Sequence, residues 1–297
     1  MKYEAIDKQL YISNRKNFVE RLNPKSVAVF NSNDIMPTNA DGTMPFRQNN
    51  DLLYLSGIDQ EESILVIAPD ASNPKHREVL FVKETSELIA IWEGDKLTKE
   101  KATERSGIES VYWLTDFDNV FHSIATEMDT IYLNQNEHLR AITTVETRDD
   151  RFRAECKSKY PDHSYKRLAP IMRNLRPIKS QLEIDVMQKA CNITEKGFRR
   201  VLDFVKPGVM EYEIEAEFMH EFLMNRSKGY AYEPIIASGY NACVLHYIQN
   251  NMECKAGDVI LMDVGAEYAN YAADMTRCIP VSGSFTDRQK DVYNAVL

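Results

Sequence analysis

The chain has 297 residues, of which 43% are hydrophobic and 27% are charged. This length is sufficient for two domains that each bury a core. There are 36 lysines and arginines against 45 aspartates and glutamates, so the formal net charge is −9. That acidic balance argues against nucleic acid as the main partner. No stretch approaches the ~20 apolar residues that span a bilayer, so no membrane segment is expected.

The N-terminus and the cysteines indicate a compartment. The first residues (MKYEAID) contain neither an apolar core nor a small-residue cleavage site, so no secretory signal is expected. The cysteines form no CxxC pair and predict reduced thiols in a cytoplasmic protein. They are Cys156, Cys191, Cys243, Cys254 and Cys278.

The first part of the chain alternates predicted strands and helices. Segments rich in Val, Ile, Leu, Phe and Tyr predict strands at residues 26–30, 63–68, 78–83, 110–114 and 130–133. Helices are predicted at residues 8–22, 98–106 and 116–127. This order favours an α/β or α+β domain over residues 1–160. Prolines and clustered basic residues make residues 161–179 a predicted connector.

A second domain is predicted over residues 180–297. Ser180 and Glu183 form a capping box for a helix to about Val205. A further helix is predicted at residues 211–227, with strands at residues 233–237, 242–247 and 259–264. The glutamates of the 211–227 helix are expected to be solvated; they are Glu211, Glu213, Glu215, Glu217 and Glu221. Five histidines fit no ligand spacing and are predicted to be surface or packing residues: His76, His122, His138, His163 and His220.

Residues 258–277 (DVILMDVGAEYANYAADMTR) predict a hairpin with an aspartate on each strand. A turn over residues 267–270 pairs residues whose numbers sum to 537, which places Asp263 directly opposite Asp274, with Cβ atoms about 4.5 to 5.5 Å apart. Opposed carboxylates repel unless a cation lies between them, and two divalent ions about 3.5 to 4 Å apart fit this spacing. A solvated surface pair is the alternative. The apolar residues 259–262 are typical of a buried strand and favour metal, but the hairpin alone leaves both interpretations open.

The last residues predict a helix with no end signal. Thr286 and Gln289 form another capping box, and Val292, Val296 and Leu297 supply an apolar stripe. No Gly, Pro or polar tail follows. We therefore expect an N-terminal fragment of a longer protein.

Several segments, in this order and at these spacings, carry a family resemblance. Residues 46–57 (FRQNNDLLYLSG) and 91–94 (IWEG) are similar to N-terminal domain signatures, and residues 237–247 (ASGYNACVLHY) to a segment with an active-site histidine. Residues 262–268 (MDVGAEY) and 273–277 (ADMTR) are similar to segments with metal-binding aspartates. The chain resembles the aminopeptidase P branch of the creatinase, prolidase and methionine aminopeptidase superfamily (peptidase family M24). A creatinase-type N-terminal α/β domain and the first part of a pita-bread catalytic domain are implied.

The resemblance implies a dinuclear metal site, with Mn²⁺ as the expected ion, that activates a hydroxide to attack a peptide carbonyl. Asp263 would hold one ion and Asp274 would bridge both. His246 would contact the substrate near the scissile bond rather than bind metal. Trp92 is similar to a tryptophan that reaches a neighbouring subunit's active site; a buried core aromatic is the alternative. Thr276 could orient Asp274, with ordinary strand packing as the alternative.

The implied activity is removal of a first residue that precedes proline, by a cytoplasmic homo-oligomer acting on peptides. The family uses five metal ligands, and three of them, a histidine and two glutamates, follow the second aspartate. No histidine or glutamate follows Asp274 in this chain, so the 297 residues alone are expected to be inactive. The alternatives are a prolidase acting on Xaa-Pro dipeptides and a non-catalytic pita-bread module that binds peptides.

Overall fold

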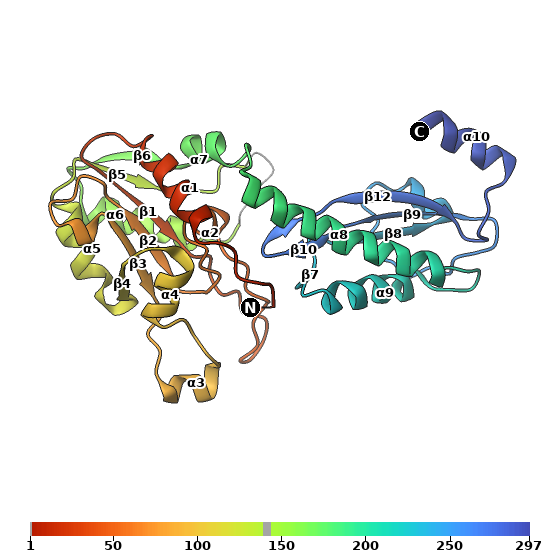
Figure 1. Ribbon diagram of the computed structural model, residues 1–297, viewed down its shortest axis with the longest axis horizontal. Coiled ribbons are helices and arrows are strands. Elements are labelled where there is room, and N and C mark those ends of the chain that lie inside the picture. Colours follow the sequence, from red (N-terminus) through yellow and green to blue (C-terminus); the bar gives the residue numbers. More distant parts are fainter. Residues whose placement is uncertain (1, 139–143) are drawn as a thin grey trace. The chain divides into compact units, whose positions relative to one another are not determined.

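The computed structural model describes residues 2–138 and 144–297, which form two compact units. Ala5–Lys179 make up the first unit, and Ser180–Leu297 with residues 2–4 make up the second. Both units combine helices and strands (Figure 1). The mixed α/β class predicted from the sequence is therefore confirmed.

The first unit is built on a six-stranded sheet in the order β4-β3-β2-β1-β5-β6. In this sheet β2 is antiparallel to both of its neighbours, β1 and β3, whereas the other neighbouring strands are parallel. The strands are β1 (Ser26–Asn31), β2 (Ile64–Ile67), β3 (Glu78–Val82), β4 (Ser110–Trp113), β5 (Thr130–Leu133) and β6 (Ser164–Arg167). The five strands predicted for this domain are confirmed.

Helices cover both faces of this sheet, because successive strand residues point to opposite sides. In β1, Ala28 and Phe30 belong to one hydrophobic core and Val27 and Val29 to the other. The first core is closed by α1 (Gln9–Val19), α2 (Asn50–Ser56), α4 (Lys99–Ser106) and α7 (Ala169–Leu175). The second is closed by α5 (Phe117–Ala125) and α6 (Arg148–Lys159). Burial on both faces explains the continuous apolar runs of the strands.

The predicted connector, residues 161–179, is instead part of the first unit. β6 pairs with β5 and extends the sheet, and α7 places Met172 and Leu175 in the first core. The prediction was wrong because β6 (SYKR) is a mostly exposed edge strand with basic residues. Charged residues on an edge strand discourage pairing with other chains, and in sequence they resemble a linker.

The second unit has two long helices, α8 (Gln181–Phe204) and α9 (Glu211–Met224), and two three-stranded sheets. α8 starts at the predicted capping box, in which the Glu183 carboxylate accepts the Ser180 N–H at 2.8 Å. A shorter helix, α10 (Asp287–Val296), starts at the capping box of Thr286 and Gln289. The sheets have the orders β12-β9-β8 and β11-β10-β7. The strands are β7 (Gly229–Tyr230), β8 (Ile235–Ser238), β9 (Val259–Val264), β10 (Ala266–Tyr268), β11 (Tyr271–Ala272) and β12 (Met275–Pro280).

The strand predicted at residues 242–247 is absent. The segment begins within a short 3₁₀ helix, Gly239–Cys243, and continues as a turn. Val244 is 46% and Leu245 89% exposed. Strand propensity reflects packing against a neighbouring strand, and the described residues supply none here. Nowhere in the described ranges does a helix combine the length and apolar character that crossing a membrane requires.

Two neighbouring carboxyls at the start of α6 have opposite environments. Asp149 is half-buried, with Asn31 Nδ2 donating to its Oδ1 at 2.9 Å, and burial raises its pKa to about 6. Asp150 accepts the Thr147 hydroxyl at 2.7 Å in a capping box, and this bond lowers the pKa of Asp150. A raised carboxyl pKa favours folding below the unfolded pKa, and that contribution is lost as pH rises through the folded value. A lowered carboxyl pKa has the opposite effect: it favours folding above the unfolded pKa, and that contribution is lost as pH falls through the folded value.

We therefore expect Asp149→Asn to stabilise the first unit at pH 8 by up to about 3 kcal/mol and to leave its stability unchanged below pH ~4. Asp150→Asn is the matched control and should destabilise the unit at pH 8 by less than about 1 kcal/mol. Urea unfolding followed by tryptophan fluorescence measures this, because Trp92 and Trp113, the two tryptophans of the chain, both lie in this unit. The prediction would be contradicted if the free energy of unfolding changed with pH in the same way for Asp149→Asn and the unmodified chain.

Candidate metal centre

The predicted hairpin forms, with a register two residues away from the one expected. β9 pairs with β12 and β10 with β11, and paired residue numbers sum to 539. Thr276, and not Asp274, therefore lies directly opposite Asp263. The turn is a two-residue loop of Ala269 and Asn270, whose φ values are 53° and 66°. Two left-handed residues match the twist of the flanking strands, which moves the turn one residue beyond the predicted position.

Both aspartates nevertheless lie on one side of the hairpin, since a shift of two residues preserves strand parity. β9 alternates between half-buried and buried residues, with Ile260, Met262 and Val264 buried. Asp263 is on the half-buried face, and Asp274 is exposed. The apolar run of residues 259–262 is thus not the fully buried strand that the sequence indicated, because the described residues leave one face of this sheet partly open.

Tyr232 brings the two carboxylates together. Its hydroxyl oxygen lies 2.6 Å from Asp263 Oδ1 and 3.0 Å from Asp274 Oδ1. Burial, followed by these two contacts, raises the pKa of Tyr232, so the phenol is protonated at neutral pH. A phenol carries a single proton and cannot donate to both carboxylates at once. The arrangement therefore holds two anions around one shared donor.

The close approach of the strands beside Asp274 depends on Gly265. An added Cβ at Gly265 would lie 1.8 Å from the carbonyl oxygen of Ala273 and 3.2 Å from the amide nitrogen of Asp274. Glycine is therefore required where β9 passes into β10. Gly265 is the one residue between β9 and β10, and Ala273 and Asp274 are the two residues between β11 and β12 on the opposite side of the hairpin.

Glu211 is a second residue of this unit that the sequence interpretation misplaced. It was expected to be solvated, but it is fully buried and its carboxylate accepts four hydrogen bonds. The donors are the N–H and hydroxyl of Ser238, the hydroxyl of Tyr247 and the N–H of Met252, at 2.7 to 3.0 Å. The helical phase of Ile214, Phe218 and Phe222, which are all buried, was the available signal: position 211 lies on the same stripe.

His246 lies in the turn that Glu211 supports. It is exposed, and the next residue, Tyr247, is buried and donates to Glu211. The same turn exposes Tyr240 and Leu245 at 85% and 89%. His246 is therefore accessible to a ligand. Its position is fixed by the neighbouring Tyr247, which is buried and bonded to Glu211.

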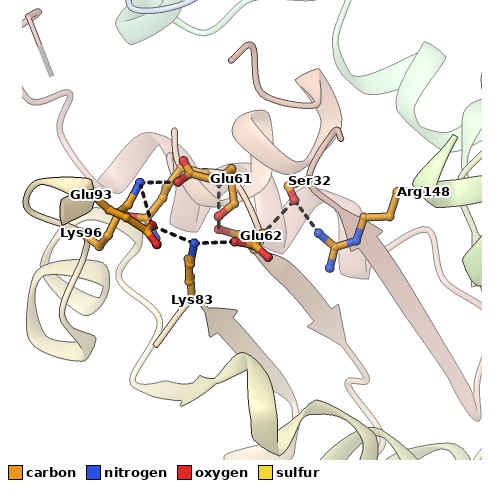
Figure 2. Close-up of polar contacts among 9 residues, drawn as sticks. Ser32, Glu61, Glu62, Lys83, Glu93, Lys96 and Arg148 are labelled. Atoms are coloured by element: carbon orange, nitrogen blue, oxygen red, sulfur yellow. Dashed lines mark hydrogen bonds and ion pairs between the residues drawn. The ribbon is translucent and has the colours of Figure 1, made fainter. Parts of the chain in front are cut away.

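Trp92 belongs to the first unit, on α3 (Glu87–Glu93), and is 84% exposed. The buried-core alternative for Trp92 is therefore wrong. α3 buries none of its residues and is connected to the rest of the unit by ion pairs. Glu93 contacts Lys83 at 2.8 Å, and Lys96, just beyond the helix, contacts Glu61 (Figure 2). The apolar side chains of α3 are thus presented to solvent.

The two carboxylates around Tyr232 are of the ligand type that divalent metal ions bind. Carboxylate oxygens suit hard divalent cations, and a cation between Asp263 and Asp274 would relieve their repulsion. Such ions need about four to six ligands each. In the described ranges, no three His, Cys, Asp or Glu residues come together to hold a metal ion. These residues therefore fit an ion in kind but are too few to complete its coordination.

Two families match the chain, one for each unit. Residues 185–297 match Metallopeptidase family M24, and residues 11–132 match the family Aminopeptidase P, N-terminal domain. The chain is similar to the Xaa-Pro aminopeptidase of Escherichia coli strain K12, with 31% identity over 98% of this chain and 66% of that protein.

Two solved structures also resemble it. Pseudomonas aeruginosa aminopeptidase PepP has a TM-score of 0.88 and 28% identity, covering 98% of this chain and 66% of that one. A variant of Escherichia coli aminopeptidase P in complex with substrate has a TM-score of 0.85 and 30% identity, covering 99% and 67%. The fold and the paired carboxylates thus define a chain of the metallopeptidase class. It belongs to metallopeptidase family M24, in the aminopeptidase P branch. It spans about two thirds of the length of these relatives.

Replacement of Glu211 tests the anchor beneath His246. Glu211→Ala removes the acceptor of the buried N–H and hydroxyl of Ser238 and one acceptor each from Tyr247 and Met252, so we expect a destabilisation of about 3 kcal/mol. Hydrogen exchange at the amides of Ser238 and Met252 should accelerate, as measured by mass spectrometry of peptides covering residues 235–252. His220→Ala, at an exposed position of the same helix, is the control and should leave this exchange unchanged. Equal protection in Glu211→Ala would show that the carboxylate is not the anchor.

Proposed function

We propose that this chain provides the N-terminal two thirds of a metal-dependent aminopeptidase that releases the first residue from peptides with proline at the second position. The observation that carries the proposal is the convergence of Asp263 and Asp274 on one hydroxyl. Membership of the aminopeptidase P branch supports the substrate class. We place the protein in the cytoplasm, as a homo-oligomer whose α3 presents Trp92 to a neighbouring subunit.

In this proposal Asp263 and Asp274 hold two divalent ions, with Mn²⁺ as the expected metal, and the remaining ligands come from outside these 297 residues. When bound, such ions lower the pKa of a water molecule and polarise a carbonyl. The chain's own residues set the geometry. Tyr232 fixes the two carboxylates, and Gly265 allows their strands to approach. His246 donates a hydrogen bond to the peptide near the scissile bond, where charge develops during hydrolysis.

The activity is tested with the longest reading frame that encodes this chain, purified and loaded with Mn²⁺. We expect release of alanine from Ala-Pro-Ala and little release from the dipeptide Ala-Pro, which separates an aminopeptidase from a prolidase. Asp274→Asn should lower kcat/KM by more than the roughly 100-fold typical of losing an outer-shell partner. The 297-residue chain alone should be inactive. Unchanged activity in Asp274→Asn would contradict the metal assignment, and peptide binding without hydrolysis would indicate a non-catalytic module.

The role of Tyr232 is tested separately from turnover. Tyr232→Phe removes the hydroxyl that orients both carboxylates, so we expect the affinity for Mn²⁺ to fall roughly 10- to 100-fold in isothermal titration calorimetry. Tyr240→Phe, at an 85% exposed position of the same unit, is the control and should bind Mn²⁺ as the unmodified protein does. Equal affinities for the two variants would show that Tyr232 does not position the ligands.

A further inference from the structure

The first unit contains a cavity of about 540 Å³ at the carboxyl edge of its sheet. Its walls come from the end of β1, the start of β2, the start of α5 and one side of α6. The chain passes from β1 to β2, β3 and β4 on one side and then crosses to β5 and β6 on the other. Ligands of open α/β sheets bind outside the carboxyl ends of the strands at such a reversal of strand order. The cavity lies outside the carboxyl ends of β1 and β4, on one side of that reversal, and its lining residues include none from β5.

Arg148, the first residue of α6, provides a cationic group in the cavity wall. Its Nη1 donates to Ser32 Oγ at 2.9 Å, and Ser32 is 1% exposed (Figure 2). Across residues 2–138 and 144–297, no carboxylate oxygen lies within 4.0 Å of this guanidinium. The nearby Asp34 is already paired with Arg151 and with the backbone N–H of Arg148. Burial lowers the pKa of Arg148, which reflects incomplete solvation of its charge.

The nearby carboxylates of Asp34, Glu62 and Asp149 balance the charge of Arg148 only in part, because burial still lowers its pKa on balance. A partly buried cation whose charge is incompletely balanced attracts an anion, and a guanidinium recognises a carboxylate through paired hydrogen bonds. Ser32 occupies one nitrogen of Arg148, which leaves donors on the others. The hydroxyl is held in place because Ser32 Oγ also accepts the N–H of Ser63 at 3.2 Å. The guanidinium of Arg148 is thus oriented by a hydroxyl, and Glu62, another carboxylate of this wall, is paired with Lys83 at 2.9 Å.

The far end of the cavity is acidic. Glu155 lies two turns along α6 from Arg148, about 10 Å away along the helix axis, and also lines the cavity. In the part of the chain that the structure describes, Glu155 forms no hydrogen bond or ion pair. Asp118 of α5 adds a second carboxylate, 3.5 Å from Lys159. Between the two ends, Phe117 and Phe152 meet edge to face with ring centroids 5.8 Å apart. One end of the cavity therefore carries two arginines, Arg148 and Arg151, beside the paired carboxylates of Asp34 and Glu62. The middle is apolar, and the other end carries only carboxylates among the lining residues.

We propose that this cavity binds a short peptide with free termini, its terminal carboxylate on Arg148 and its terminal ammonium at Glu155 and Asp118. A peptide of two or three residues spans roughly 7 to 10 Å when extended, which is comparable with the rise of about 10 Å along α6 from Arg148 to Glu155. An apolar middle side chain contacts the two phenylalanines. All of these residues belong to Ala5–Lys179, so the site is separate from Asp263 and Asp274 and does not depend on the proposed catalytic function.

The test is titration of the complete chain with the tripeptide Ala-Leu-Ala in metal-free buffer, by calorimetry and NMR. This peptide has no proline, which separates binding here from substrate binding at the proposed catalytic site. Arg148→Met should weaken binding by about 10-fold or more. Arg153→Met, an arginine of the same helix that pairs with Asp150, is the matched control and should leave it unchanged. Glu155→Gln should weaken binding of the free peptide but not of its N-acetylated form.

Modified peptides keep the test independent of folding defects in a variant. A C-terminally amidated Ala-Leu-Ala should bind the unmodified chain about 10-fold or more weakly, and Arg148→Met should not distinguish the amidated from the free peptide. Unchanged binding in Arg148→Met would overturn the proposal. So would binding of inorganic phosphate or acetate as tight as that of the peptide, because the cavity would then recognise an anion alone.

Discussion

Asp263 and Asp274 are held within hydrogen-bonding distance of one phenolic oxygen, and a single proton cannot neutralise both carboxylates. Like charges at this separation repel, so the backbone must hold them together. The hairpin does so with a two-residue turn at Ala269 and Asn270 and a glycine where the strands come closest. The turn and the glycine both lie within the hairpin itself, and both help to place the two carboxylates around Tyr232.

This geometry shows what a sequence can predict about a site. The two aspartates are found from their spacing, because strand parity is maintained when the register shifts by two residues. Their true partners are not found, since the turn conformation decides whether Asp274 or Thr276 faces Asp263. Tyr232 lies 31 residues before Asp263, and no periodic pattern connects them. A contact of this kind is set by tertiary packing alone.

The same distinction holds for the fold. The buried strands of the first unit and the capping boxes at Ser180 and Thr286 were predicted correctly, because each has a local physical signal. β6 and the segment at residues 242–247 were predicted wrongly, in opposite directions. The basic residues of β6 led to the prediction of a connector instead of an edge strand. The apolar, β-forming residues at 242–247 led to the prediction of a strand, although the described residues provide no strand for it to pair with. In both cases the deciding factor was a neighbour distant in sequence.

Glu211, Arg148 and Asp149 show how burial changes the meaning of a charged residue. Glu211 receives four donors and becomes a structural anchor. Arg148 and Asp149 are adjacent and opposite in charge, and in sequence they resemble a self-neutralising pair. On a helix, however, successive side chains project about 100° apart. Asp149 turns toward Asn31, while Arg148 reaches Ser32 at the wall of the cavity. The two charges attract each other, but burial outweighs that attraction at both groups: it raises the pKa of the Asp149 carboxyl and lowers the pKa of the Arg148 guanidinium.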